Sequence, residues 1–444
     1  MIRFLRKLWN DRRGNALVIA GAALPVLVGA AGLATDTVQW ALTKRQLQRA
    51  ADSAALAAAY QEAQGQKAFK DTSGGTATSG TCSASATPAV TYDLTQNDHS
   101  GRSPTCNVAT GVTWNTKADA NAVKVTLSAS ANLTFAEMFM SSAPTVTASA
   151  TATMVDNGNY CLVALNNTNT TGITMQGSSK AYLGCGAISD SVSSSSVTTN
   201  GNAYTFQATT VAAVGDMTST ILGCNDATSV AANVNCTTNP YTLPEPDPYS
   251  SLSMDIPSNV TCKSSSQNSQ GKTYNPGCYT DFSFSGNQTY KLNPGTYYLK
   301  NTDFSTTGGV TIQGTGVTII LTGDTPGKIN LGGNTTLELS APTSGTYTNM
   351  LIMQSGTNLS SSNSNDSIDG NNGSYFDGAI YAPKGNITFG GSSSTANQCT
   401  MVVGWTVNFS GNTSQLQKSL YRPDGTTACT NATTVSGKQI RLVA

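Results

Sequence analysis

Residues 309–323 read GVTIQGTGVTIILTG, which is two short apolar runs that each end at a glycine turn. The β-branched residues in each run favour strands of about 4–6 residues. The same kind of unit recurs on both sides, as in YKLNPGTYYL, KINLGGNTTLELS, YTNMLIMQSG, FDGAIYAPKGNITFGG and MVVGWTVNFSGN. Short strands that end in Gly or Asn are typical of stacked β-coils. We therefore predict a mainly β body that forms a right-handed parallel β-helix, with Val, Ile and Leu along its axis.

The repeats fall into two stretches of the chain. Residues 281–444 hold the clearest units, and residues 156–239 echo them in CLVALNN, GITMQGSSKAYLGCGAISD and NAYTF. We expect a first β-helix block at 156–239 and a second at 281–444, with a Pro-rich excursion at 240–280 between them. Local hairpins within the same runs would instead give a β-sandwich, so that alternative stays open.

An apolar segment lies near the N-terminus. Residues 16–34 read ALVIAGAALPVLVGAAGLA, and a helix of this length spans about 28 Å, close to a hydrocarbon core of about 30 Å. Five positive charges precede it, namely Arg3, Arg6, Lys7, Arg12 and Arg13. The positive-inside rule predicts a basic cytoplasmic head at 1–15, a single transmembrane helix at 16–35, and a body outside the cytoplasm. A cleaved signal peptide that ends in the small residues Gly32 and Ala34 is the alternative.

Charge is scarce and balanced. Charged residues make up 11% of the chain and the formal net charge is zero, so no overall field attracts nucleic acid. There is neither a phosphate-binding loop nor a basic patch, and we expect no nucleic-acid partner. Because His99 is the only histidine, multi-His zinc sites are ruled out and the scope for His-based triads is nearly removed. We expect His99 itself to be a surface residue.

The cysteines favour an oxidising compartment. All ten follow the apolar segment, their number is even, and no Cys-x-x-Cys motif occurs. A set of this kind is typical of disulfides in an exported protein. Pairing of consecutive cysteines is the simplest guess, and it gives Cys82–Cys106, Cys161–Cys185, Cys224–Cys236, Cys262–Cys278 and Cys399–Cys429.

Residues 36–64 continue the helix beyond the apolar segment. The spacing of one set of apolar and small residues places them on a single helical face: Trp40, Leu47, Ala51, Ala54 and Ala58. Small residues allow close approach of a second element. The face could therefore bind a partner helix in an assembly, or it could pack only against the chain's own body. The sequence leaves both alternatives open.

Residues 12–59 resemble the N-terminal region of TadG-like Flp (tight-adherence) pilus-assembly proteins. The resemblance lies in Arg13-Gly14 before the apolar run, Asp36, Trp40, the segment 44–48 (KRQLQ) and the Ala-rich end at 50–59. Residues 122–153 resemble the next segment of that family, within a small disulfide-linked β-containing region at 65–155. The resemblance implies a single-pass inner-membrane protein of a bacterial pilus system, with a periplasmic or extracellular body and other Tad/Flp pilus-assembly proteins as partners.

Two features depart from proteins of such systems. Some family members carry a metal-binding Asp-x-Ser-x-Ser motif, but the candidate at residues 190–194 has Val192 in place of the first Ser, so we expect no such metal site. Prepilins of the same systems carry a Glu five residues after the cleaved Gly. Counted from Gly14, that position holds Ile19.

The remaining candidates for chemistry are few. Asp366, Asp369 and Asp377 are the densest acids and could bind calcium, although their spacing differs from an EF-hand and suits an ordinary turn-rich loop. We expect no catalytic residue, no metal and no cofactor, and a structural role in pilus assembly. An adhesive or carbohydrate-binding β-helix is the alternative. Exposed aromatic residues would favour it, and the ones to inspect are Tyr297, Tyr298, Tyr375, Phe376 and Tyr381.

Overall fold

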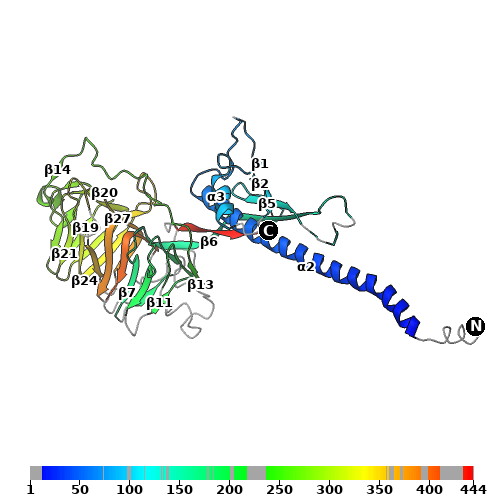
Figure 1. Cartoon of the computed structure of the whole chain (residues 1–444). Coiled ribbons are helices and arrows are strands. Elements are labelled where there is room, and N and C mark those ends of the chain that lie inside the picture. Colours follow the sequence, from blue (N-terminus) through cyan, green and yellow to red (C-terminus); the bar gives the residue numbers. More distant parts are fainter. Residues whose placement is uncertain are drawn as a thin grey trace, which may run out of the picture. The chain divides into compact units, whose positions relative to one another are not determined.

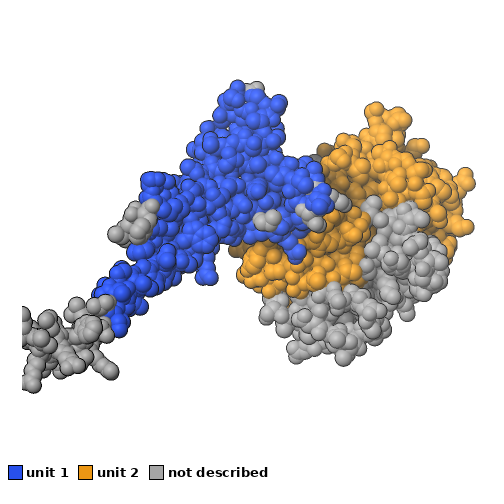
Figure 2. All heavy atoms as spheres, turned by 90° about the vertical axis from the view of Figure 1, so that its right-hand side faces the viewer, with its two compact units in different colours: residues 1–155, 440–444 blue, residues 156–439 orange. Residues whose placement is uncertain are grey.

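The computed structural model describes residues 13–410 and 434–443. Within them it leaves out residues 74, 98–101, 115, 132, 134, 137–139, 178–179, 184, 201–204, 218–236, 357, 360–364, 371–373 and 392–398. Only the backbone is described at 13–18, 117, 180–182, 205–207, 370, 375, 391 and 399. The chain forms two compact units, coloured separately in Figure 2: residues 1–155 with 440–444, and residues 156–439. The boundary falls inside strand β6 (Thr145–Ala164) and inside strand β29 (Val435–Leu442).

Unit 1 consists of a long helix, a short helix and an antiparallel sheet. Helix α2 (Arg13–Ala63) leads the unit, and the blue unit in Figure 2 narrows to this helix alone. It ends shortly before Gly65, whose φ of +75° suits a residue that terminates a helix. The other elements are β1 (Ser79–Thr81), α3 (Pro88–Asn97), β2 (Thr105–Thr110), β3 (Thr113–Trp114), β4 (Lys117–Ala118) and β5 (Val123–Ser130). The sheet has the antiparallel order β1-β2-β5-β6, and β3 pairs with β4.

The core of unit 1 lies between this sheet and the second half of α2. Every second residue of β5 is buried, from Val123 through Val125 to Leu127, whereas Lys124 is exposed. This period of two gives the sheet one apolar face. The apolar face of the sheet and the Ala-rich part of α2 belong to one buried cluster.

Unit 2 is a β-solenoid of about 8 turns, and the chain is 45% strand, which makes the fold mainly β. The predicted stack of parallel coils is therefore confirmed, and the β-sandwich alternative is excluded. Its strands form three parallel faces around one continuous apolar core. Successive segments of the chain lie on different faces, and long strands such as β24 and β27 contribute to more than one face. A segment therefore pairs with the segment one turn away.

The first face holds, in spatial order, β14 (Cys262–Lys263), β17 (Gly277–Tyr279), β20 (Gly295–Lys300), β23 (Val317–Thr322), β25 (Met350–Gln354), β27 (Tyr375–Gly391), β28 (Cys399–Phe409), β6, β9 (Gly186–Ser189), β12 (Thr210–Ala213) and β13 (Thr237–Pro240). The second face holds β18 (Ser283–Ser285), β21 (Phe304–Thr307), β24 (Ile329–Ser340), β26 (Asn365–Gly370), then β27 and β28 again, β7 (Ile173–Gln176) and β10 (Val197–Asn200).

The third face holds β16 (Thr273–Tyr274), β19 (Thr289–Leu292), β22 (Thr311–Thr315), β24 and β27. β8 (Lys180–Tyr182) and β11 (Thr205–Gln207) form a separate parallel pair. The short 3₁₀ helix η2 (Ser265–Gln267) and strand β15 (Ser269–Gln270), which is antiparallel to β16, precede these turns.

Gly and Asn form corners of the coils, as the sequence predicts. Asn301 follows β20 with a φ of +54°, and Gly323 follows β23, one turn later, with a φ of +108°. The Asn301 side chain accepts a hydrogen bond of 2.9 Å from the Thr325 N–H. A Cβ at Gly323 would overlap Asn301 Oδ1, so the tight stacking of these two corners requires glycine.

The turns of the solenoid do not stack in chain order. β28, from the second stretch of repeats, pairs in parallel with β6 from the first, with Val402 opposite Leu162 and Val403 opposite Val163. β28 also pairs with β7, with Val407 opposite Ile173. The last described turn of the second stretch therefore stacks on the first turn of the first stretch. Consequently β13 and β14, although close in sequence, lie at opposite ends of the solenoid (Figure 1).

The connecting segment, residues 241–261, has to run back along the solenoid from β13 to β14. Its contacts follow the first face strand by strand. Glu245 reaches the turn after β9, Tyr249 packs edge-on against Tyr381 of β27 at 5.4 Å, and Ser253 accepts a hydrogen bond from the Tyr347 hydroxyl beside β25. Four apolar residues of the connecting segment pack against outward-facing side chains of the first face, namely Leu252, Met254, Ile256 and Val260. The connecting segment thus covers the outer surface of this sheet.

Candidate functional site

Helix α2 carries a run of exposed apolar side chains. Leu24, Val26 and Leu27 are 61, 70 and 67% exposed, and the helix continues through Pro25 without interruption. A water-soluble surface rarely carries such a continuous apolar patch. The helix is long and apolar enough to cross a membrane, by length and composition. This part of α2 is therefore a candidate membrane anchor.

Asp36 lies two residues beyond the predicted apolar run, and its carboxylate is satisfied by unit 1. The side chain is buried. Its Oδ1 accepts a hydrogen bond of 3.1 Å from the Phe135 N–H, and its Oδ2 accepts one of 2.6 Å from the Ala136 N–H. Hydrogen bonds between a carboxylate and backbone N–H groups are among the stronger ones. The Asp that the family resemblance singles out therefore holds the loop between β5 and β6 against α2.

The segment 44–48 also binds within unit 1. Lys44 Nζ donates to the carbonyl oxygen of Thr147 in β6. Gln48 Nε2 donates to the Ser149 carbonyl at 3.0 Å and to Asp52 Oδ1 at 2.8 Å. Both polar residues attach the helix to the backbone of β6. Sequence reasoning recognised this segment by its resemblance but did not predict its intramolecular role.

The predicted partner face of α2 is mostly internal. Leu47, Ala51, Ala54 and Ala58 are each 0% exposed and belong to the cluster that α2 shares with α3, β2, β5 and β6. Their small side chains allow the chain's own sheet to approach the helix closely. A partner helix cannot reach these residues while unit 1 is folded as described. Of the five predicted residues, only Trp40, which is 46% exposed, is available to a partner.

The opposite side of α2 is open. Four large hydrophobic residues are exposed there, namely Val38, Leu42, Leu56 and Tyr60. Arg45 and Arg49, which lie between Leu42 and Leu56 in the sequence, are exposed as well. Their spacing of 4, 3, 4, 7 and 4 residues places all six on one side of the helix, which we call the outward face. A mixed apolar and cationic surface of this kind is a candidate protein contact.

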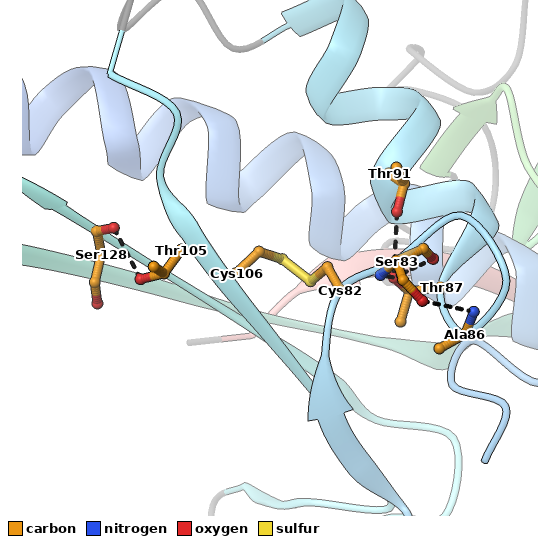
Figure 3. The surroundings of a disulfide bond; sticks show 8 residues. All are labelled: Cys82, Ser83, Ala86, Thr87, Thr91, Thr105, Cys106 and Ser128. Carbon is orange, nitrogen blue, oxygen red and sulfur yellow. Dashed lines mark hydrogen bonds between the residues drawn. A yellow bond between two sulfur atoms is a disulfide. The ribbon is translucent and has the colours of Figure 1, made fainter. Parts of the chain in front are cut away.

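A disulfide fixes the start of α3 to the sheet of unit 1. Cys82, after β1, is bonded to Cys106 in β2 (Figure 3). Next to it, Ser83 Oγ accepts from the Ala86 N–H at 3.1 Å and Thr87 Oγ1 accepts from the Ser83 N–H at 3.0 Å. This reciprocal arrangement resembles a capping box and sets the N-terminus of α3.

Two further disulfides lie in the solenoid. Cys161–Cys185 joins β6 to the residue before β9, and Cys262–Cys278 joins two direct register partners of β14 and β17. The three bonds all join consecutive cysteines, which is the pairing that the sequence suggests. Cys224, Cys236 and Cys429 lie outside the described residues, as does the side chain of Cys399 and the whole of His99. The described part of the chain holds no free cysteine.

The densest acids do not form an open loop. Asp366 and Asp369 lie in strand β26, not in the turn-rich loop that the sequence suggests. Asp366 is 0% exposed, and its Oδ1 accepts from the Ile329 N–H at 2.8 Å and from Gln354 Nε2 at 2.9 Å. Asp369 accepts from the Ser367 hydroxyl. Among the described residues, no group of three or more His, Cys, Asp or Glu could hold a metal ion.

The aromatic residues that would favour an adhesive surface are mostly buried. Tyr297, Phe376 and Tyr381 are at most 2% exposed, and Tyr298 is 7% exposed. The side chain of Tyr375 lies outside the described part. Tyr297 packs inside the solenoid core, whereas Tyr298 and Tyr381 lie in the cluster beneath the connecting segment.

Comparison with known protein families confirms the resemblance of the N-terminal region. Residues 14–62 match the sequence model of the family described as Flp pilus-assembly TadE/G-like. The match covers α2 almost from end to end, including Asp36, Lys44 and Gln48. Neither the curated proteins nor the solved structures gave a match to the chain.

Proposed function

We propose that the chain is a non-enzymatic structural component of a bacterial Flp (Tad) pilus-assembly system. The observation that carries this proposal is the family match at residues 14–62, which coincides with α2 and with the residues that dock α2 onto unit 1. In this proposal the helix anchors the protein in the inner membrane and the solenoid forms a rigid exported body.

The orientation follows from charge and cysteine chemistry. Five positive charges precede the apolar run, so the N-terminus lies in the cytoplasm and the chain after residue 35 lies on the periplasmic side or beyond. Three disulfides in the described residues require an oxidising compartment, which supports the same orientation.

The outward face of α2 is the contact surface for other pilus-assembly proteins in this proposal. It lies within the matched region, directly after the anchor, and its apolar residues have no cover from unit 1. The adhesive alternative is weaker, because four of the five aromatic residues it depends on are buried.

The test uses chromosomal variants in the producing bacterium. Leu56→Glu combined with Tyr60→Glu places two charges on the outward face, and Tyr92→Glu changes an exposed residue of α3 outside the matched region. We expect the first variant to lose surface pili and co-purification with pilus-assembly proteins, and Tyr92→Glu to retain both. In both variants the protein should still be exported with the Cys82–Cys106 disulfide formed.

Two outcomes would contradict the proposal at different levels. Normal piliation and co-purification of the Leu56→Glu, Tyr60→Glu variant would exclude the outward face as the contact surface. Normal piliation after deletion of the whole gene would exclude a role in pilus assembly.

A further inference from the structure

One loop of unit 1 lies against α2 at the end of its apolar run. The loop connects β5 to β6, and its Phe135 and Ala136 donate backbone hydrogen bonds to Asp36. The Phe135 ring also occupies the space above Gly32, where an added Cβ would overlap three of its ring atoms. The loop therefore contacts the helix on both sides of the last apolar residue of the run, Ala34.

These contacts fix the depth of the loop relative to a membrane. Each helical residue advances about 1.5 Å, so Gly32 lies about 3 Å before Ala34 and Asp36 about 3 Å beyond it. If the run 16–34 spans the hydrocarbon core, the Phe135 ring lies at the boundary between hydrocarbon and headgroups. Met140, in the same loop, is a large apolar residue that is 48% exposed.

The neighbouring side chains suit the headgroup layer. Trp40 is 46% exposed and lies about 9 Å beyond Ala34 along the helix. Arg102 Nη1 donates a hydrogen bond of 2.9 Å to the Ser130 carbonyl, where β5 ends and the loop begins. Indole rings and cations with long apolar stems favour the interface between lipid and water.

We propose that Phe135, Ala136 and Met140, among the described residues of the β5–β6 loop, form a second membrane contact, with Phe135 and Met140 in the lipid interface on the side of the bilayer that carries the sheet of unit 1. The partner is the phospholipid headgroup layer, and the proposal rests on the membrane anchor of the proposed function. The loop holds unit 1 at a fixed depth and fixes the rotation of α2, so the outward face always points in one direction along the membrane surface.

Lipid photocrosslinking tests the proposal on the full chain. The chain is reconstituted into vesicles of phosphatidylethanolamine and phosphatidylglycerol, with p-benzoylphenylalanine in place of Met140, and covalently attached lipid is measured by mass spectrometry. Leu33, exposed within the apolar run, is the positive control position, and Tyr92 on α3 is the negative one. We expect lipid attachment at Met140 comparable to that at Leu33 and none at Tyr92.

The outcomes separate the loop from the anchor. Attachment at Leu33 but not at Met140 would overturn the loop contact and leave the anchor intact. Absence of attachment at Leu33 would mean that the helix is not in the membrane, and the anchor itself would fail together with the loop.

A matched pair of glycine variants tests the docking of the loop. Gly32→Leu fills the space that the Phe135 ring occupies, whereas Gly29→Leu adds the same side chain where nothing lies within 4 Å. We expect Gly32→Leu to lower lipid attachment at Met140 by about threefold or more, because overpacking displaces the loop from the helix. Gly29→Leu should leave attachment at Met140 unchanged. Equal attachment in both variants would show that the contact with Gly32 does not position the loop.

Discussion

The Glu245 N–H donates a hydrogen bond of 2.8 Å to Oδ1 of Asp190, and this contact holds the connecting segment against the turn after β9. Asp190 is 5% exposed and Glu245 is partly buried. The pKa of Asp190 is raised from 3.8 to about 7, mainly by burial; the hydrogen bond from the Glu245 N–H opposes this shift, and the negative charge of Glu245 adds to it. Burial also raises the pKa of Glu245 to about 7, although the positive charge of Lys438 opposes that shift.

The two carboxyl groups predict that unit 2 loses stability as the pH rises. Because folding raises both pKa values, the folded unit holds protons that the unfolded chain releases. The contribution of these two protonated carboxyl groups to the free energy of unfolding is complete below about pH 4 and is lost as the pH rises towards 7. We expect the free energy of unfolding to fall by about 2–4 kcal/mol between pH 5 and pH 8, mainly through the buried Asp190, since Glu245 is more screened by solvent. Urea unfolding at several pH values measures this.

Two variants serve to assign the effect. Asp190→Asn keeps the acceptor for the Glu245 N–H but cannot ionise, and it should remove most of the dependence on pH. Asp255→Asn, at an exposed position of the same segment, should leave the dependence as it is. A wild-type unit 2 that is equally stable at pH 5 and pH 8 would contradict the argument.

Tyr249 is a main contact between the connecting segment and the first face of the solenoid, so its removal measures how strongly the segment is bound there. Its ring packs edge-on against Tyr381, and its hydroxyl donates to Met401 Sδ at 3.2 Å. We expect Tyr249→Ala to destabilise unit 2 by about 1.5–3 kcal/mol, because it exposes part of the apolar first face. Ser251→Ala, at an exposed position, should change the stability by less than about 0.5 kcal/mol. Equal urea midpoints for the two variants would indicate a loosely held segment.

The solenoid could be predicted from the sequence because its local signals all agree. Residues 309–323 became β22 and β23, with a corner at Gly316. The hairpin alternative could not be excluded from these residues alone, because the pairing partners lie outside them. Ile312 pairs with Tyr290, and Val317 pairs with Gly295, one turn earlier in each case.

The order of the turns and the path of the connecting segment could not be predicted. Pairing of β28 with β6 joins residues more than half the chain apart, and local periodicity carries no information about such contacts. The sequence does contain one indication that the first face is covered. The runs at 350–353 (MLIM) and 401–403 (MVV) are apolar on both sides of the strand, which indicates a sheet that is covered on its outer face as well.

Helical periodicity identified a buried face of α2 but not what covers it. Leu47, Ala51, Ala54 and Ala58 do share one face, as their spacing predicts. The same pattern arises whether the covering element belongs to a partner or to the chain itself. Only the position of β5 and β6 decides between these possibilities.

A glutamate introduced at Ala54 and one introduced at Leu56 should have opposite effects on the stability of unit 1, because Ala54 is buried and Leu56 is exposed. Ala54→Glu places a carboxylate in the core of unit 1, and we expect it to destabilise that unit by about 3 kcal/mol or more. Leu56→Glu, on the outward face, should leave unit 1 folded. Limited proteolysis measures this, with cleavage of residues 65–155 expected in the Ala54→Glu protein alone. Resistance of that protein to cleavage would mean that a partner, not the chain's own sheet, normally covers Ala54.

The pairing of β28 with β6 predicts that the solenoid survives a break in the connecting segment. Ser250 and Ser251 are exposed, so a protease site inserted between them can be cut in the folded protein. The two fragments would still share the apolar core and the parallel contact between Val403 and Val163. We expect the cut protein to elute as one particle in gel filtration and its fragments to separate only in denaturant.

Val403→Asp provides the control for this experiment. The substitution places a charge on the face where β28 meets β6, at a residue that is 0% exposed, and burial of an unpaired carboxylate costs several kcal/mol. The fragments of the cut Val403→Asp protein should therefore separate at a lower denaturant concentration than those of the cut wild-type protein, because only contacts such as Tyr249 with Tyr381 and β28 with β7 then hold the two stretches together. If the fragments of the cut wild-type protein separated without denaturant, the two stretches would be independent bodies joined by the connecting segment alone. If the cut variant separated at the same denaturant concentration as the cut wild-type protein, the contact between β28 and β6 would not be what unites the two stretches.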